Sequence, residues 1–418
     1  MTKSKKQLST AKSPAMLLIL LCWLVYSSSY LGKVNYSANI TQIMDFYGIS
    51  KSQAGVVPTF FFFAYGVGQV FNGIFCKRYN VKWVVFIALI ISSAINLFIA
   101  VSTGFAMIKW LWLINGFVLS MLWPTMVRLL SDSLPRKSLG ASSVIMGTTV
   151  AVGTFLVYGL SSVYAAFGSF KLAFYTASVL VLAVAFLWIF AYKKTVSAAK
   201  QEKLNELSDI QTDNDSEKPT NPDSGKKLFY TTIFILCFCA VGVNLIKDGL
   251  TTWVPSILKD EFNMSDSLSI LLTLLLPVLA VFGNAYALSV HKKIPDYVNH
   301  CGLFFAIMAV VTGVIIGSLT LRIVSFMLLG LIVVNFLASS LNSLITSIFP
   351  LFMRGKVNSG KYAGILNGFC YLGSTISSYG LGVIADNFGW TAVFYTLIGF
   401  SAAVCVIWCV YYFVKNKK

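Results

Sequence analysis

The chain has 418 residues, of which 57% are apolar, 15% aromatic and only 11% charged. Soluble domains carry about 25% charged residues, so this composition excludes a string of water-soluble domains and predicts an integral membrane protein. The formal net charge is +17, but the basic residues lie in short clusters between long apolar runs, a distribution that excludes a nucleic-acid-binding surface. The two histidines and eight cysteines have no metal-ligand or haem spacing, so we expect neither a metal site nor a cofactor.

Twelve apolar runs are long enough to cross a bilayer, because a spanning helix needs about 20 residues. They cover residues 15–44, 53–76, 82–103, 105–130, 139–163, 170–192, 228–254, 266–290, 299–319, 322–350, 362–385 and 390–414. The runs are continuously apolar rather than alternating, which excludes a transmembrane β-barrel. The predicted fold class is therefore an all-α membrane protein with twelve transmembrane helices.

The distribution of basic residues predicts the orientation of these helices. If the N-terminus is cytoplasmic, 24 lysine and arginine residues lie on the cytoplasmic side and five on the opposite side. Such an excess of positive charge marks the cytoplasmic face of a membrane protein. We therefore predict a multi-pass protein of the plasma membrane with both termini in the cytoplasm, and we attribute most of the net charge to topology.

A polar stretch and an internal repeat divide the chain into two halves. Residues 193–227 are rich in charge and predict a solvated, partly disordered cytoplasmic linker. This divides the chain into a cytoplasmic tail at 1–14, a six-helix bundle at 15–192, the linker, a second six-helix bundle at 228–414 and a cytoplasmic tail at 415–418. Tyr158-Gly159-Leu160 recurs 221 residues later as Tyr379-Gly380-Leu381. Two pseudo-symmetric six-helix bundles related by an axis along the membrane normal are typical of the major facilitator fold.

Lys33 and Lys247 are basic residues deep inside apolar runs. Both lie roughly 27 Å from the start of their spans, at the helical rise of about 1.5 Å per residue. A lysine near mid-membrane costs about 2.5–3.5 kcal/mol, so we expect a functional reason for each. Their matching positions in the two halves predict two cations facing one central cavity that binds an anionic substrate. The alternative is that span 1 ends early and Lys33 reaches the membrane surface.

Tyrosines and one aspartate complete the predicted site. Tyr26, Tyr30 and Lys33 follow an i, i+4, i+7 spacing, which places them on one helix face. Asp248 follows Lys247 directly, so the two side chains leave the helix about 100° apart and we expect no ion pair between them. Asp248 then has three open roles: it holds Lys33 across the cavity, takes up a coupling proton, or pairs with a neighbouring helix.

Several stretches resemble the organophosphate:phosphate antiporter family, the glycerol-3-phosphate and hexose-phosphate transporters of the major facilitator superfamily. The matching residues are Tyr30-Leu31-Gly32-Lys33-Val34-Asn35, Ala64-Tyr65-Gly66, Gly73, Asn115-Gly116, Trp123-Pro124, Arg136-Lys137, Lys247-Asp248-Gly249, Trp253, Pro255, Leu258 and Gly368-Phe369-Cys370-Tyr371-Leu372-Gly373-Ser374. They are scattered over nearly the whole chain.

The resemblance implies the identity of the site residues. Lys33 and Lys247 occupy the positions where the family has two arginines for the substrate phosphate, and the residues that match its cavity tyrosines are Tyr26, Tyr30, Tyr65 and Tyr371. The chain also departs from the family pattern. Lysine keeps the point charge of arginine but loses its bidentate geometry for phosphate. Asp248 has no counterpart in the family motif.

We therefore predict a secondary active transporter that moves a small organic anion, an organophosphate or a carboxylate, by alternating access coupled to exchange or to an ion gradient. Its expected partners are this anionic substrate and the lipid bilayer, with no nucleic acid, and we expect a monomer. One alternative is a proton-coupled carrier of neutral or cationic compounds with Asp248 as the proton site. Another is a transporter-like receptor that senses a ligand. An enzyme is not expected, because no constellation of catalytic side chains is visible.

Overall fold

The computed structural model describes residues 13–75, 78–209, 226–352 and 359–416, and within these ranges all regular structure is helical. The elements are α1 (Pro14–Ser29), α2 (Leu31–Ala38), α3 (Ile40–Tyr47), α4 (Lys51–Phe75), α5 (Val81–Val101), α6 (Ile108–Ser120), α7 (Leu122–Ser133), α8 (Arg136–Gly147), α9 (Thr149–Ala166), α10 (Lys171–Asp209), α11 (Lys226–Phe262), α12 (Asp266–Thr273), α13 (Leu275–Ala280), α14 (Gly283–Lys293), α15 (Tyr297–Thr320), α16 (Val324–Ser343), the π-helix η3 (Leu344–Ile348), α17 (Phe349–Phe352) and α18 (Ser359–Asn416).

The membrane-crossing helices agree with the predicted spans. The described residues contain ten helices that are long and apolar enough to cross a membrane, or eleven when the bent pair Asp266–Ala280 and Ala285–Lys293 is counted as one span. Helix α18 is one of the ten, but Gly389 interrupts it with a non-helical backbone at φ 77° and ψ 176°. The sequence predicts two spans there, 362–385 and 390–414. When α18 is counted as two spans, the number of membrane-crossing segments is consistent with the predicted twelve. The fold is that of an all-α membrane protein.

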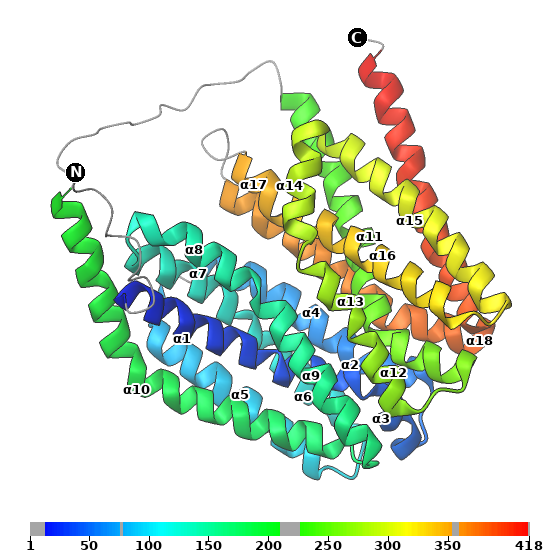
Figure 1. Cartoon of the computed structure of the whole chain (residues 1–418), viewed down its shortest axis with the longest axis horizontal. Coiled ribbons are helices and arrows are strands. Elements are labelled where there is room, and N and C mark those ends of the chain that lie inside the picture. The colour runs from blue at the N-terminus through cyan, green and yellow to red at the C-terminus, as the bar shows by residue number, and fades with distance from the viewer. Residues whose placement is uncertain (1–12, 76–77, 210–225, 353–358, 417–418) are drawn as a thin grey trace, which may run out of the picture.

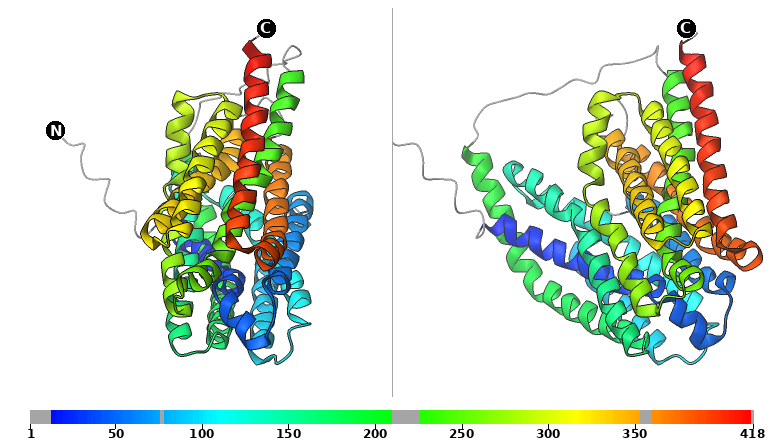
Figure 2. Two further views of the ribbon diagram at one scale, coloured as in Figure 1. Left: turned by 90° about the vertical axis from the view of Figure 1, so that its right-hand side faces the viewer. Right: turned by 45° about the vertical axis from the view of Figure 1, so that its right-hand side comes forward.

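The helices form two groups that follow the order of the chain. Helices α1 to α10 lie on one side of the molecule and α11 to α18 on the other (Figure 1). The two groups approach each other around α2, α3 and α12, whereas the ribbons diverge toward α8, α14 and α17. The rotated view on the right of Figure 2 shows the same divergence. The ion pairs between the groups, described below, lie at the end where they converge.

Asparagine side chains fix α2, the short helix that carries Lys33. A Cβ atom on Gly32 would lie 2.9 Å from Asn96 Nδ2, so only glycine permits this approach of α2 to α5. The Asn115 amide donates to the Gly32 carbonyl at 2.7 Å, and the Asn35 amide donates to Asn96 Oδ1 at 2.8 Å. These buried hydrogen bonds have no competition from water, so they hold α2 in one position against α5 and α6.

Helix α10 extends into the stretch predicted as a linker. It continues to Asp209 rather than ending near residue 192, because residues 193–209 are rich in the strong helix formers Ala, Lys, Glu, Leu and Gln. Glu202 on this extension accepts a hydrogen bond from the Ala15 backbone amide at 3.0 Å and pairs with Lys137 at 3.6 Å. The extension thus packs onto the first helix group. Residues 210–225 of the predicted linker, 1–12 of the N-terminal tail and 417–418 lie outside the described residues.

The surface of the helix groups is largely apolar. Many large apolar side chains are more than half exposed, among them Phe63, Phe190, Phe234 and Val310. Apolar exposure on this scale is incompatible with a water-soluble monomer, and it is the surface that lipid chains solvate. The polar side chains described below therefore lie among helices whose outer surface is largely apolar.

Candidate functional site

Lys33 lies in a cage of aromatic rings. Its Nζ is 4.3 Å from the centroid of the Tyr65 ring, 5.0 Å from that of Tyr30, 5.8 Å from that of Phe61 and 5.9 Å from that of Tyr371. The rings come from α4, α18 and the junction of α1 and α2, so the ammonium group points between helices and not along the surface. In the described part of the chain no carboxylate forms an ion pair with Lys33.

The four predicted tyrosines and two further rings form one continuous set, the ring cluster. Its members besides Lys33 are Tyr26, Tyr30, Phe61, Tyr65, Trp123 and Tyr371. Tyr26 contacts Tyr30 edge-on at 5.7 Å and Trp123 at 4.9 Å between ring centroids. Tyr65 and Tyr371 approach to 4.7 Å, because Gly66 has no side chain where a Cβ atom would meet Tyr371 Cβ at 2.9 Å.

Phe61 was not among the predicted site residues. It is 1% exposed and stacks on Tyr65 with 5.7 Å between centroids. The two residues are four positions apart on α4, so the i, i+4 rule applied to Tyr65 was the signal that identifies Phe61. The run Phe60-Phe61-Phe62-Phe63 hides this signal, because its rings point in every direction around the helix.

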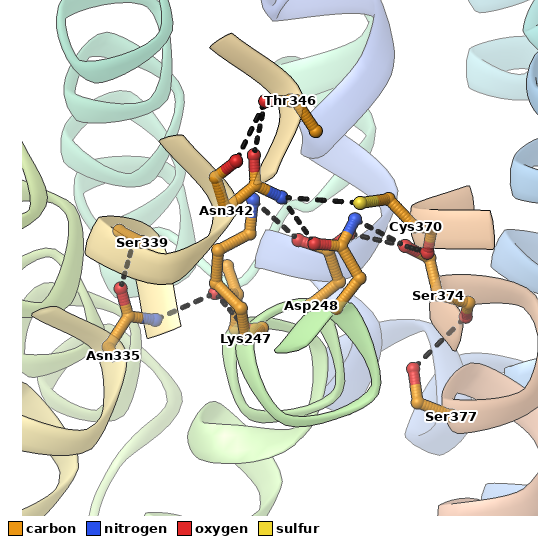
Figure 3. Close-up of polar contacts among 11 residues, drawn as sticks. Lys247, Asp248, Asn335, Ser339, Asn342, Thr346, Cys370, Ser374 and Ser377 are labelled. Atoms are coloured by element: carbon orange, nitrogen blue, oxygen red, sulfur yellow. Dashed lines mark hydrogen bonds and ion pairs between the residues drawn. The ribbon is translucent and has the colours of Figure 1, made fainter. Parts of the chain in front are cut away.

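Lys247 and Asp248 form an ion pair, contrary to our expectation from the sequence. Lys247 Nζ lies 3.3 Å from Asp248 Oδ1, and Figure 3 shows the two side chains turned toward each other. The expectation considered only the directions in which the Cα–Cβ bonds leave α11. It was wrong because the four-carbon stem of lysine is long enough to bend back to its neighbour. Of the three roles left open for Asp248, the hydrogen bond from Ser374 of α18 matches a pairing with a neighbouring helix.

Amide and hydroxyl groups surround this ion pair and make up the amide cluster with it (Figure 3). Its other members are Asn244, Thr251, Asn335, Asn342 and Ser374, from α11, α16 and α18. The Ser374 hydroxyl donates to Asp248 Oδ2 at 2.5 Å, and the Asn342 amide donates to Asn244 Oδ1 at 2.5 Å. The Asn244 amide lies 3.4 Å from Asp248 Oδ2, and the Asn335 amide donates to the Thr251 hydroxyl at 3.4 Å.

The asparagines of this cluster were not among the site residues predicted from the sequence. Asn244 precedes Asp248 by one helical turn, which is a weak signal. Asn335 and Asn342 lie inside a predicted span, where a polar side chain needs a partner, but nothing in the sequence says which partner. Ser374 was part of the family resemblance without an assigned role.

The two clusters are neighbours. Tyr371 of the ring cluster and Ser374 of the amide cluster are three residues apart on α18 and so lie on the same helix face. The side chains of Lys247 and Asp248 are 27% and 18% exposed, so solvent reaches part of the amide cluster.

Ion pairs join the two helix groups at their converging end. Lys259 of α11 binds Asp45 of α3 at 2.5 Å, and Lys51 of α4 lies 3.1 Å from Asp260 of α11. Asp386 of α18 accepts hydrogen bonds from the backbone amides of Lys51 and Ser52 at 3.1 and 2.7 Å. Among the described residues, the ion pairs elsewhere stay within one group: Arg128–Asp132, Lys137–Glu202, Lys247–Asp248 and Lys415–Asp296.

Comparison with known proteins gives several relatives of similar length. The chain is 22% identical to a probable hexose phosphate transport protein of Chlamydia muridarum, over 84% of this chain and 80% of that protein. It is 22% identical to the membrane sensor protein UhpC of Escherichia coli K12, over 93% and 90%. It is 23% identical to the hexuronate transporter of Bacillus subtilis 168, over 91% and 90%.

Solved structures similar to this fold include membrane transporters. The structure matches that of a bacterial homologue of the human lysosomal transporter Spinster in an inward-facing, occupied conformation, with a TM-score of 0.72, 14% identity and coverage of 96% of this chain and 97% of that one. The family model described as Major Facilitator Superfamily matches residues 22–360. The chain, a multi-pass membrane protein, therefore belongs to the Major Facilitator Superfamily.

Proposed function

We propose that this secondary transporter moves a small organic anion, which binds between Lys33 of the first helix group and Lys247 of the second. The observation that carries the proposal is the position of Lys33, an ammonium group inside the helix bundle, ringed by aromatic faces and without a carboxylate partner among the described residues. Such a cation favours an anionic ligand, because ring faces offset only part of the cost of burying a charge.

The amide cluster provides the second contact to the anion. A lysine ammonium has three N–H donors, and the ion pair with Asp248 uses one of them. Tyr26, Tyr30, Tyr65 and Tyr371 then shape the wall of the site, and Asp248 orients Lys247. The names of two relatives, a hexose phosphate transport protein and a hexuronate transporter, support an anionic substrate.

The membrane arrangement follows from the charge bias and is part of the proposal. The protein lies in the plasma membrane as a monomer with both termini cytoplasmic, and residues 15–192 and 228–414 form the two six-helix bundles. The tails and residues 193–227, of which 193–209 continue helix α10, face the cytoplasm, and no nucleic acid takes part. In this orientation the ion pairs of Lys51 and Lys259 lie on the outer side.

The contacts between the groups then support one state of an alternating-access cycle. Ion pairs and backbone hydrogen bonds link the bundles on the outer side, and the ribbons diverge on the cytoplasmic side (Figure 1). We infer that the state described is closed to the outside. Exchange of substrates or an ion gradient supplies the energy for the return to the outward state.

Uptake into proteoliposomes tests the proposal. The purified full-length chain is reconstituted, and the uptake of radiolabelled glucuronate and glucose 6-phosphate is measured for the wild type and for Lys33→Ala and Lys247→Ala. Each variant loses about 100-fold or more in transport, as is usual when a buried ionic contact to a ligand is removed. Lys109→Ala is the matched control, because Lys109 also lies over an aromatic ring, that of Trp110, but outside both clusters. Normal uptake by both site variants contradicts the proposal.

A second candidate function is ligand sensing, and the likeness to the membrane sensor protein UhpC favours it. A sensor binds its ligand at the same site but does not move it across the membrane. Ligand binding that depends on Lys33 and Lys247, together with no flux under any imposed gradient, would replace transport by sensing. Flux that follows an imposed pH gradient and is lost in Asp248→Asn would instead show Asp248 to be a proton-coupling group.

A further inference from the structure

The charges of the two clusters do not match a phosphate ester. The ring cluster contributes one positive charge, from Lys33, whereas Lys247 and Asp248 of the amide cluster neutralise each other at 3.3 Å. The binding region therefore offers a net charge of one positive unit. At neutral pH a phosphate monoester carries about 1.5 to 2 negative charges, and a sugar carboxylate carries one. Only the carboxylate leaves the loaded site electrically neutral, which matters most in a bundle surrounded by lipid.

The two clusters also differ in what they offer a ligand beyond charge. The ring cluster presents aromatic faces and phenols around a single ammonium group. The amide cluster presents side chains that both donate and accept hydrogen bonds: Asn244, Asn335, Asn342, Thr251 and Ser374. Groups of this kind match hydroxyls, which also donate and accept, with both their donors and their acceptors, whereas a phosphate, which at neutral pH mainly accepts, uses only their donors. The charge of the ligand is thus matched by Lys33 of the first helix group, and its hydroxyls by the amide cluster of the second.

We propose that the substrate is a polyhydroxylated monocarboxylate, a sugar acid, whose carboxylate faces Lys33 and whose hydroxyls face the amide cluster. This inference rests on the function proposed above and narrows it to one chemical class. Lysines at both cationic positions agree with it, because a lysine is a point charge and does not provide the bidentate fork with which arginine favours phosphate. Asp248 is then a specificity-determining residue, since it sets the net charge of the site at one.

Binding to the detergent-purified full chain tests the substrate class. Thermal stabilisation is titrated near pH 7.5 with glucuronate, glucose 6-phosphate, glucose and butyrate, and each titration yields a dissociation constant. Glucuronate binds about tenfold more tightly than each of the other three, because glucose 6-phosphate brings excess charge, glucose lacks charge and butyrate lacks hydroxyls.

Charge variants separate this account from a simple loss of contacts. Asp248→Asn leaves a site with two positive charges, so its preference moves about tenfold or more toward glucose 6-phosphate. Lys247→Gln leaves the opposite charges of Lys33 and Asp248, a net charge of zero, and so weakens the binding of both glucuronate and glucose 6-phosphate. The double variant Lys247→Gln/Asp248→Asn returns the net charge to one and regains the preference for glucuronate. Asp132→Asn is the matched control, because the Asp132 carboxylate pairs with Arg128 one turn away on the exposed face of α7, outside both clusters.

The inference is overturned if the wild type prefers glucose 6-phosphate, if no hydroxylated probe binds, or if Asp248→Asn leaves the preference unchanged. These outcomes differ from a failure of the proposed function. Tight binding of butyrate or glucose 6-phosphate that still depends on Lys33 removes the sugar-acid class and leaves the anion site in place. Binding of any anion that is indifferent to Lys33 and Lys247 removes both.

Discussion

Lys33 depends on its neighbours in sequence for its position. Gly32 allows α2 to approach α5, and the Gly32 carbonyl accepts a hydrogen bond from Asn115, so the residue before Lys33 is fixed on two sides. The ammonium group then has only the space that Tyr65, Tyr30 and Tyr371 leave for it. At this scale the function rests on a glycine as much as on the lysine.

Gly32→Ala tests this dependence. The added Cβ would lie 2.8 Å from Ser92 Oγ and 2.9 Å from Asn96 Nδ2, so α2 must shift away from α5. We expect the variant to lose about 1–3 kcal/mol of stability, as overpacked sites do, and to bind the anion more weakly. Thermal unfolding and ligand titration in detergent measure the two effects. Gly313→Ala, at a position with no atom within 4 Å of the added Cβ, is the control that keeps wild-type behaviour. Equal behaviour of the two variants would contradict the account.

Asp296 gives a pH-dependent prediction outside the membrane spans. Its carboxylate caps α15 by accepting from the amides of Val298 and Asn299, and it pairs with Lys415. Burial raises the pKa of Asp296, but the Lys415 ammonium and the Asn299 amide outweigh it and hold the pKa below the ordinary 3.8. A lowered pKa in the folded state stabilises the fold above the unfolded pKa, and this contribution disappears as the pH falls through the folded value.

Asp296→Asn therefore lowers stability only where the carboxylate is ionised. Asparagine still caps a helix, so the variant removes mainly the charge, at a cost of about 1–2 kcal/mol near pH 7. Thermal unfolding near pH 7 and near pH 3 measures the difference between variant and wild type. We expect that difference to shrink at the lower pH. A constant difference would show that the charge of Asp296 contributes nothing.

At the scale of elements, the N-terminus of α4 is held by the other helix group. Asp386 of α18 accepts from the first two amides of α4, which is the role of a helix cap played by a residue 335 positions away. The same end carries the ion pairs Lys51–Asp260 and Lys259–Asp45. Any opening of this end must release the α4 cap, so the cap couples helix stability to the state of the transporter.

Asp386→Ala should loosen this end of the molecule. Without the acceptors, the amides of Lys51 and Ser52 open to solvent, and we expect their hydrogen exchange to become about tenfold faster, which corresponds to roughly 1.4 kcal/mol. Hydrogen exchange followed by mass spectrometry reads the peptide at the start of α4. The start of α5, capped by its own Asn80, is the internal reference and keeps its rate. Unchanged exchange at α4 would show that Asp386 does not hold it.

Most elements could be predicted from the apolar runs, whereas the contacts between them could not. Spans such as 82–103 and 299–319 agree with α5 and α15 to within a few residues, because a long apolar run has few alternatives to a helix. The extension of α10 to Asp209 was missed because polar residues can be either helix or linker, and packing of Glu202 against α1 decides between them. The bond between Asn342 and Asn244, 98 residues apart, leaves no periodic trace in the sequence.

At the scale of the whole molecule, the internal repeat predicts two halves, and the helices form two groups that follow the order of the chain. Lys33 and Lys247 were predicted as a pair because their positions in the two halves match. Lys33 lies in the ring cluster and Lys247 in the amide cluster. Helix α18 contributes to both, with Tyr371 in the ring cluster and Ser374 in the amide cluster. The difference between the clusters, aromatic around Lys33 and amide-rich around Lys247, was beyond the sequence. It arises from residues on α4, α16 and α18 that only the fold brings next to the lysines.

The central claim is that one anion contacts both lysines. A double-mutant cycle on ligand binding tests it most directly, with Lys33→Gln, Lys247→Gln and the two combined, each measured by titration on the purified chain. We predict that each single variant loses most of the affinity. The double variant should bind about tenfold or less more weakly than the single variant with the lower affinity, because one ligand must contact both lysines to bind tightly. Losses that simply multiply, or a single variant that binds like the wild type, would contradict the claim.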